Sequence, residues 1–194
     1  MVELKIEENI YQMPNSWKEV NIKKYIEINN LETKSNVKKM VQMISILSGC
    51  PIDILYQVDL EALNKIDINW LSEPMDDKIE KILEIDGKKY GIIKEMKKLS
   101  LGEYVDLDSY ILDINNNLHM IVAILMRPIL SEDGDLYIIE KYDTNTLKAR
   151  AELFLENMNV EQLINVSSFF SNSANGYLES MKSFLQSQEK TIKI

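Results

Sequence analysis

The sequence contains few of the residues on which covalent and metal chemistry depends. Among its 194 residues are one cysteine, Cys50, one histidine, His119, and six scattered glycines. A single cysteine excludes an internal disulfide and a cysteine-rich zinc site. The isolated glycines form neither of the glycine-rich loops that hold nucleotide phosphates. We therefore expect no metal and no cofactor, and no small-molecule substrate is evident from the sequence.

Basic residues are also fewer than acidic residues. Lys and Arg total 22 against 31 Asp and Glu, which gives a formal net charge of −9. Binding to DNA or RNA requires clustered cations that displace counterions from the phosphates. The charge therefore argues against nucleic acid as the main partner, and for the same reason against an anionic membrane surface.

The chain lacks a long apolar segment as well. Its richest run, residues 120–126, is bounded by His119 and by Arg127-Pro128, whereas a membrane-spanning helix needs about 20 apolar residues. The N-terminal residues alternate between apolar and charged side chains instead of forming an apolar signal sequence. We expect no membrane span and a cytoplasmic location in the cell that makes the protein.

What is present is a composition of 45% hydrophobic and 27% charged residues, which is typical of a globular protein. Apolar residues recur at steps of three and four, which predicts helices, in segments that begin near residues 21, 37, 59, 100, 117, 144, 160 and 177. Asp86-Gly87 and Asp133-Gly134 tolerate the positive φ angles of tight turns. They predict one hairpin from residues 79–85 and 88–93, and another from residues 129–130 and 136–139, while residues 1–8 alternate as a strand does.

Together these patterns predict a mainly α fold (α+β), in which a compact helical domain carries one or two small β-hairpins. No linker rich in Gly, Ser or Pro divides the chain. We assign residues 1–140 to the helical domain with its hairpin and residues 141–194 to C-terminal helices. These helices either belong to the same domain or form a separate arm.

The helix that begins at Ser100 has a clear start signal. Ser100 and Glu103 have the spacing of a capping box, in which each side chain accepts a hydrogen bond from the other residue's backbone N–H. Apolar residues follow at helical spacing, and we expect them to form a stripe buried against the core: Leu101, Tyr104, Val105, Ile111 and Leu112.

The sequence offers two isolated groups that catalysis could use. His119 lies within a predicted helix beside its apolar stripe, with no assignable carboxylate or nucleophile partner, so we interpret it as structural instead of as a general base. Cys50 follows Gly49 at a helix end, and we interpret it as a small buried hydrophobe instead of a nucleophile. The acidic residues 132–135 lack the spacing of a calcium loop and indicate a solvated turn. We expect no catalytic residue and no enzyme.

Four short segments follow one another in a distinctive order. They are a Pro-x-x-Trp entry at residues 14–20, a helix ending in Leu-Ser-Gly at 44–49, an Ile-Asp-Gly-Lys hairpin at 85–91 and a Leu-Ser-Leu-Gly-Glu-Tyr helix start at 99–105. This order resembles small structural and assembly proteins of tailed bacteriophages. The resemblance implies a non-enzymatic virion or assembly protein: a cargo protein carried in the particle or tail, a tail assembly chaperone, or a neck or ring component. It also implies a location in the virion, in the cytoplasm of the infected bacterial host, or in both.

Such proteins act by binding, and the partners implied are other phage structural proteins or copies of the same chain. Apolar and aromatic residues dominate binding interfaces, and the late helices are rich in them. We hypothesise an interaction surface made of Phe154, Leu155, Phe169, Phe170, Phe184 and Leu185. On this hypothesis, deletion of residues 144–194 leaves a folded core that no longer associates.

Two alternatives from other classes stay open. One is a small hydrolase or transferase that uses His119 or Cys50. The other is a host-directed regulator that captures a cellular protein on its acidic surface, in which case complex formation would be strongly sensitive to salt.

Overall fold

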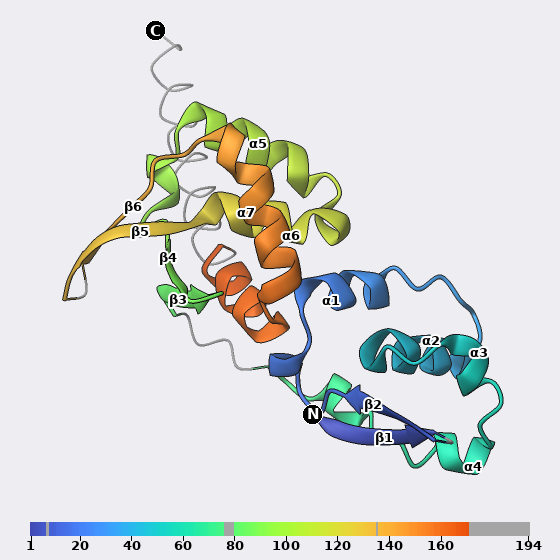
Figure 1. Cartoon of the computed structure of the whole chain (residues 1–194). Helices are drawn as coiled ribbons and strands as arrows, with labels where there is room; N and C mark the ends of the chain where they lie inside the picture. The colour runs from blue at the N-terminus through green and yellow to red at the C-terminus, as the bar shows by residue number, and fades with distance from the viewer. Residues whose placement is uncertain (7, 76–79, 135, 171–194) are drawn as a thin grey trace, which may run out of the picture.

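The computed structural model describes residues 1–6, 8–75, 80–134 and 136–170 of the chain. These residues form α-helices, three short 3₁₀ turns and two antiparallel sheets (Figure 1). The strands are β1 (Val2–Ile6), β2 (Asn9–Met13), β3 (Ile82–Ile85), β4 (Lys88–Ile92), β5 (Met126–Asp133) and β6 (Leu136–Ile139). The helices are α1 (Ile22–Asn29), α2 (Asn36–Ser48), α3 (Ile52–Leu55), α4 (Leu60–Leu63), α5 (Leu101–Ile111), α6 (Ile114–Leu125) and α7 (Thr144–Asn157), and residues 160–170 are also helical.

The prediction of a mainly α fold with one or two small hairpins is wrong, because the hairpins are parts of larger sheets. Strand β4 pairs with β5 through Tyr90–Pro128, Gly91–Arg127 and Ile92–Met126. This pairing joins the hairpins β3–β4 and β5–β6 into one four-stranded antiparallel sheet of order β3-β4-β5-β6. A separate hairpin of β1 and β2 forms a two-stranded sheet. The fold is therefore α+β with two antiparallel sheets.

The two Asp-Gly turns lie where the sequence predicts them. Asp86 and Gly87 have φ angles of 50° and 69°, which are the left-handed values that a two-residue hairpin loop requires. Gly134, with φ of 56°, lies in the turn between β5 and β6. Both predicted hairpins are confirmed, although Ile79, placed in the first of them, lies outside the described residues.

Helix α6 passes directly into strand β5 without a loop. The helix ends at Leu125 and the strand begins at Met126, so Pro128 lies inside β5 opposite Tyr90. Residues 120–126 are all buried. A helix segment that is apolar on every side packs on every side, which places α6 at the centre of its half of the molecule.

The N-terminal half departs from the sequence prediction in several places. Strand β2, helix α3 and a 3₁₀ turn at Trp17–Glu19 were not expected, and the helix expected to begin near residue 59 consists only of the short α4, followed by a 3₁₀ turn at Asn69–Ser72. Other signals in this half hold. Asn21 caps α1 by accepting a hydrogen bond from the Lys24 N–H at 3.0 Å, and Gly49 ends α2 with φ of 74°.

The buried residues form two hydrophobic clusters, drawn mainly from one half of the chain each, although Ile22 belongs to the cluster of the C-terminal half and Val160 to that of the N-terminal half. The first surrounds α2 and includes Ile44, Leu47 and Trp70. The second lies between α6, α7 and the four-stranded sheet. The two halves are joined by the packing of α1 against α6 and α7 and by two backbone hydrogen bonds: the Ile22 N–H donates to the Met158 carbonyl at 3.0 Å, and the Val160 N–H donates to the Val20 carbonyl at 2.9 Å.

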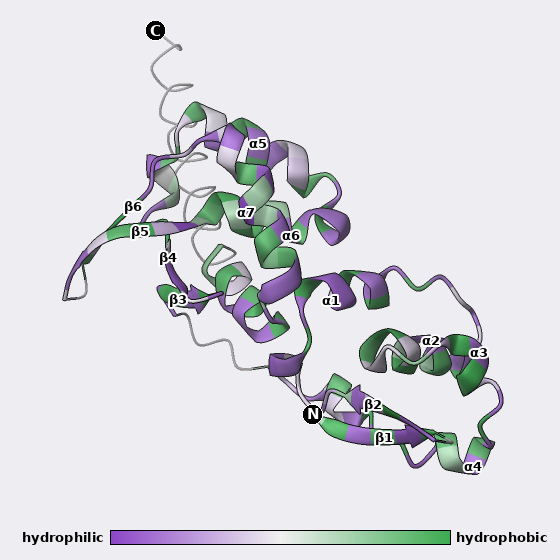
Figure 2. Ribbon diagram, in the orientation of Figure 1, coloured by the Kyte–Doolittle hydropathy of each residue, from purple (hydrophilic) through white to green (hydrophobic). Residues whose placement is uncertain are grey.

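Helix α7 belongs to the second cluster. It packs along α6, and Figure 2 shows hydrophobic residues gathered where the two helices meet. Leu147, Ala151 and Phe154 of α7 are buried there. Deletion of residues 144–194 would therefore remove part of the core, which corrects the expectation that such a deletion leaves the core folded.

No helix within the described ranges is both long enough and apolar enough to cross a lipid bilayer.

Candidate functional site

The residues hypothesised to form the interaction surface lie in different environments. Phe154 is fully buried, where its ring packs edge-on against Tyr90 at 4.9 Å between centroids. Leu155, Phe169 and Phe170 are half-buried and pack against the same core cluster. Phe184 and Leu185 lie outside the described residues. The structure therefore gives Phe154 a role in the core, and the four described members of the set, Phe154, Leu155, Phe169 and Phe170, do not form one exposed surface.

The two isolated reactive groups are both enclosed. Cys50 is fully buried, and burial raises the pKa of its thiol, which disfavours the nucleophilic thiolate. His119 is half-buried on α6, and burial lowers the pKa of its imidazole. Its Nδ1 atom is buried, and no described residue forms a hydrogen bond with it. The neighbouring titratable groups are Tyr11, which forms a side-chain hydrogen bond with Cys50, and Glu152, whose charge raises the pKa of His119.

One of the acidic residues near the second Asp-Gly turn pairs with a cation. Glu132 of β5 forms an ion pair of 2.7 Å with Lys89 of β4. Across residues 1–6, 8–75, 80–134 and 136–170, no group of three Cys, His, Asp or Glu side chains is arranged to hold a metal ion.

Helix α5 is the element whose side chains are distributed most unusually. The capping box predicted at its start is present: the Glu103 N–H donates to Ser100 Oγ at 3.3 Å, and the Ser100 N–H donates to Glu103 Oε2 at 2.6 Å. The side chains that face the body of the protein are Glu103, Asp106, Leu107 and Tyr110, of which Glu103 and Leu107 are buried. Two of these four inward residues are acidic.

Each inward acid has a specific partner. Oε1 of Glu103 lies 2.8 Å from Nη2 of Arg127, a buried residue of β5. Asp106 accepts a hydrogen bond from the Tyr142 hydroxyl. Burial, together with the adjacent Asp106 carboxylate, raises the pKa of Tyr142 well above its ordinary value. These polar contacts fix which side of α5 faces inward.

Most of the apolar residues of α5 consequently face solvent, and the exceptions are Leu107 and Tyr110. Leu101 and Leu112 are 79% and 87% exposed, Val105 is 51% exposed, and Tyr104 and Ile111 are also exposed. The expectation that these five residues form a buried stripe is therefore wrong. Their helical spacing is real, but the stripe that it produces lies on the outer surface, and we call it the α5 outer stripe. In a monomer, a contiguous exposed apolar stripe of this kind marks an interaction site more often than not.

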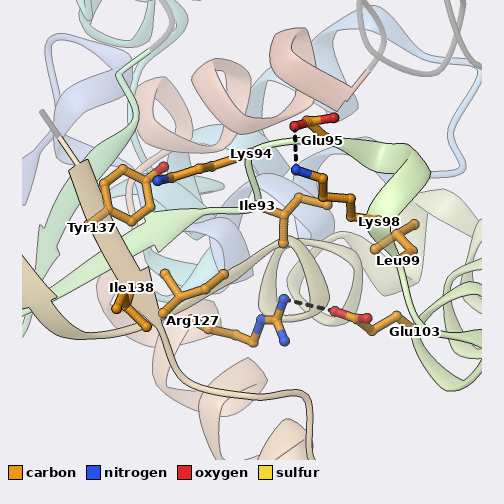
Figure 3. A pocket seen from close by; sticks show the side chains of 10 residues that line it. Ile93, Lys94, Glu95, Lys98, Leu99, Glu103, Arg127, Tyr137 and Ile138 are labelled. Carbon is orange, nitrogen blue, oxygen red and sulfur yellow. Dashed lines mark hydrogen bonds and ion pairs between the residues drawn. The ribbon is translucent and has the colours of Figure 1, made fainter.

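A pocket of about 290 Å³ opens beside the inner face of α5 (Figure 3). The buried Arg127–Glu103 ion pair lies at one side of it. Lys98 pairs with Glu95 at 2.7 Å, and the Lys94 ammonium lies 5.0 Å from the centre of the Tyr137 ring. Each cation of the pocket is thus already engaged by a neighbouring side chain, an arrangement that favours a structural role for the pocket over ligand capture.

A second buried arginine, Arg150, connects α7 to α6 and to Glu140. Arg150 of α7 donates from Nε to the Ala123 carbonyl at 2.9 Å and lies 3.6 Å from Glu140. Burial lowers the pKa of both Arg127 and Arg150, and neighbouring carboxylates oppose the shift. A guanidinium keeps its charge inside proteins, so both side chains depend on these acceptors.

The β5–β6 hairpin offers a second exposed apolar surface. Figure 1 shows the hairpin extending away from the helices. Leu130, Leu136 and Ile138 are exposed on it, whereas Tyr137 turns inward and donates from its hydroxyl to the Ile92 carbonyl at 2.7 Å. Apolar residues at the end of an extended hairpin are uncommon in a monomer that binds nothing.

The comparisons with known proteins add no assignment, because no family model, curated protein or solved structure matches this chain.

Sequence reasoning missed both exposed surfaces and the Arg127–Glu103 pair. The available signal for α5 was the presence of Glu103 and Asp106 on the face opposite the apolar stripe, with no indication of which face would be buried. That question is decided by Arg127, 24 residues after Glu103, and by Tyr142, 36 residues after Asp106.

Proposed function

We propose that this chain is a non-enzymatic protein that acts by binding another polypeptide through the α5 outer stripe, as a component or assembly factor of a tailed bacteriophage. The observation that carries the proposal is the arrangement of helix α5, in which Glu103 and Asp106 face inward whereas Leu101, Val105 and Leu112 face solvent. Exposing Leu101 and Leu112 costs the free chain the free energy of hydrating apolar surface, roughly 25 cal/mol per Å². A partner that covers these residues recovers that free energy.

The phage context rests on the order of the four short sequence segments that resemble phage structural and assembly proteins. Two roles fit a small acidic binding protein: a cargo protein carried in the particle or tail, and a tail assembly chaperone that keeps a partner soluble. A cargo protein remains in the finished virion, whereas a chaperone is left in the cytoplasm of the host. A neck or ring component is a further structural role within the same proposal.

The test compares the wild-type chain with the double substitution Leu101→Ser and Leu112→Ser in a phage genome that carries the gene. Both residues are exposed, so the variant should fold as the wild type does. Loss of the two hydrophobic contacts should lower the yield of infectious particles about tenfold or more, as expected for removal of interface anchors. The measurements are the phage titre and mass spectrometry of purified particles.

The matched control is Leu60→Ser. Leu60 is 61% exposed on α4, in the other half of the molecule (Figure 1). Its substitution by serine should therefore leave the titre unchanged. Wild-type protein in the particles identifies a cargo or structural protein, and its absence combined with a lowered titre of the double variant identifies a chaperone. An unchanged titre and particle composition with the double variant would refute the proposal. His119→Ala and Cys50→Ala test the alternative of an enzyme, since only an enzyme that uses these groups should lose activity.

A further inference from the structure

We infer that the partner of the α5 outer stripe is a basic amphipathic helix that places a lysine or arginine opposite Asp108. This inference rests on the proposed function and deepens it by specifying the chemistry of the partner. It is drawn from the spacing of the exposed residues on α5, the position of one carboxylate among them, and the charge of the surrounding segment.

The spacing of the stripe favours a helix as the partner. Leu101, Val105, Asp108 and Leu112 follow one another at steps of four, three and four, and all four side chains are exposed. Residues at these steps form a narrow seam along one side of a helix. A second helix lying along such a seam packs its side chains between those of the first. An extended strand or a loop has no matching periodicity over this length.

Asp108 determines the charge of that helix. It lies within the seam, with Val105 on one side and Leu112 on the other. No ion-pair partner for Asp108 occurs among the described residues, and it is exposed in the free chain. A partner that covers the leucines also removes water from this carboxylate. Burial of an unpaired charge is strongly unfavourable, so a tight complex requires a cation from the partner at this position. Similar polar residues within coiled-coil seams select the correct partner.

The surrounding segment reinforces this requirement. Residues 99–126 contain four acidic residues, Glu103, Asp106, Asp108 and Asp113, and neither lysine nor arginine. Asp113 is exposed next to the end of the stripe. Glu103 and Asp106 face inward, so the negative charge of the exposed face comes from Asp108 and Asp113, and the complement of this face is apolar and positively charged.

The absence of lysine and arginine from residues 99–126 also argues against a second copy of this chain bound with its α5 outer stripe against the first. A second α5 outer stripe brings its own Asp108 and Asp113 and no cation from residues 99–126. Both Asp108 carboxylates would then lose water without gaining a counterion, and like charges brought together at an interface cost several kcal/mol.

The test measures the affinity of the full chain for three synthetic helical peptides by fluorescence anisotropy. The first peptide has leucines at the spacing of the seam, a lysine at its centre and lysines along its flanks. The second has glutamates in place of all these lysines. The third keeps the lysines and replaces the leucines with serines, which detects unspecific attraction to a chain of net charge −9. We expect the first peptide to bind about tenfold or more tightly than either of the others, because it alone satisfies both the apolar and the ionic requirement.

Two variants locate the binding. Asp108→Lys should reverse the preference, so that the glutamate peptide binds more tightly than the lysine peptide, and Leu112→Ser should weaken binding of the lysine peptide. Leu60→Ser should leave every affinity unchanged. Unfolding midpoints measured for each variant separate lost binding from lost folding.

Several results would overturn the inference. They are equal affinity for the lysine and glutamate peptides, equal binding of the serine peptide, retention of the lysine preference by Asp108→Lys, and self-association of the chain that Leu112→Ser abolishes. The last result would identify a second copy as the occupant. The proposed function fails separately, when the Leu101→Ser and Leu112→Ser double variant leaves phage yield unchanged. A lowered yield with charge-indifferent peptide binding would retain the proposed function and reject only the basic partner.

Discussion

Arg127 and Glu103 form an ion pair inside the protein, with 2.8 Å between Nη2 and Oε1 and side chains only 10% and 5% exposed. The two residues come from β5 and α5, so their contact fixes the helix against the four-stranded sheet. Glu103 performs a second task, since its Oε2 accepts the Ser100 N–H of the capping box. One carboxylate therefore sets both the start of α5 and the side of the helix that faces the core.

We predict that either half of this pair is costly to remove alone. Glu103→Gln leaves the Arg127 guanidinium buried without its counterion, and Arg127→Met leaves the Glu103 carboxylate in the same condition. Each substitution should lower the free energy of unfolding by about 3 kcal/mol, as measured for other broken buried pairs. The double variant should lose less than the sum of the two, because it leaves no uncompensated charge. Urea unfolding followed by circular dichroism measures all three values.

The matched control for this prediction is the exposed pair of Lys65 and Glu61, whose Nζ and Oε1 atoms are 2.9 Å apart. Lys65→Met should change the free energy of unfolding by about 0.5 kcal/mol or less, because exposed pairs contribute little. Additive effects of the Glu103 and Arg127 substitutions, each as small as this control, would show that the pair does not position α5.

Two glycines should respond to alanine in opposite directions. A Cβ atom at Gly91 would lie 2.5 Å from Cε2 of Tyr137 and 2.9 Å from Cγ2 of Ile139, so Gly91→Ala must displace the side chains of β6. We expect a loss of about 1–3 kcal/mol, typical of overpacking. At Gly102, in the first turn of α5, the nearest atom would be 3.7 Å away on Tyr142. Gly102→Ala should raise the free energy of unfolding by about 0.5 kcal/mol, because alanine favours the helix.

Thermal unfolding of both glycine variants provides the measurement. A Gly91→Ala variant as stable as the wild type would mean that the side chains of Tyr137 and Ile139 do not lie against Gly91.

Stability should depend on the protonation of His119. Burial lowers its pKa in the folded protein below the unfolded value of 6.5, and the opposing effect of Glu152 is smaller. Below pH 6.5 the unfolded chain therefore binds a proton that the folded chain resists, so the free energy of unfolding falls as pH decreases from that value toward the folded pKa. The slope contributed by one such group is at most about 1.4 kcal/mol per pH unit.

Urea unfolding at pH 7.5 and at pH 5.5 tests this dependence. The wild type should lose more stability between the two values than His119→Gln, which has no proton to bind in this range. Equal losses in the two proteins would assign the acid sensitivity to carboxylates elsewhere.

The sequence by itself determined where turns, helix starts and helix ends lie, because these depend on local interactions. Gly87 and Gly134 mark turns because few other residues adopt their φ angles. Ser100 and Glu103 mark a helix start because their two hydrogen bonds close within one turn of backbone. The capping of α1 by Asn21 and the end of α2 at Gly49 follow from equally short-range interactions. Each of these features depends on residues only a few positions apart, so the sequence is sufficient to predict it.

The tertiary structure alone decided how these elements combine and which face of α5 is exposed. Pairing of Tyr90 with Pro128 converts two hairpins into one sheet, and the strands involved are separated by an entire pair of helices. The apolar period of α5 is the same whether its leucines point inward or outward. The choice depends on Arg127 and Tyr142, which reach the helix from elsewhere in the chain. Periodicity specifies that a helix has an apolar face and a polar face. Which of the two is buried depends on the side chains that the rest of the molecule places beside them.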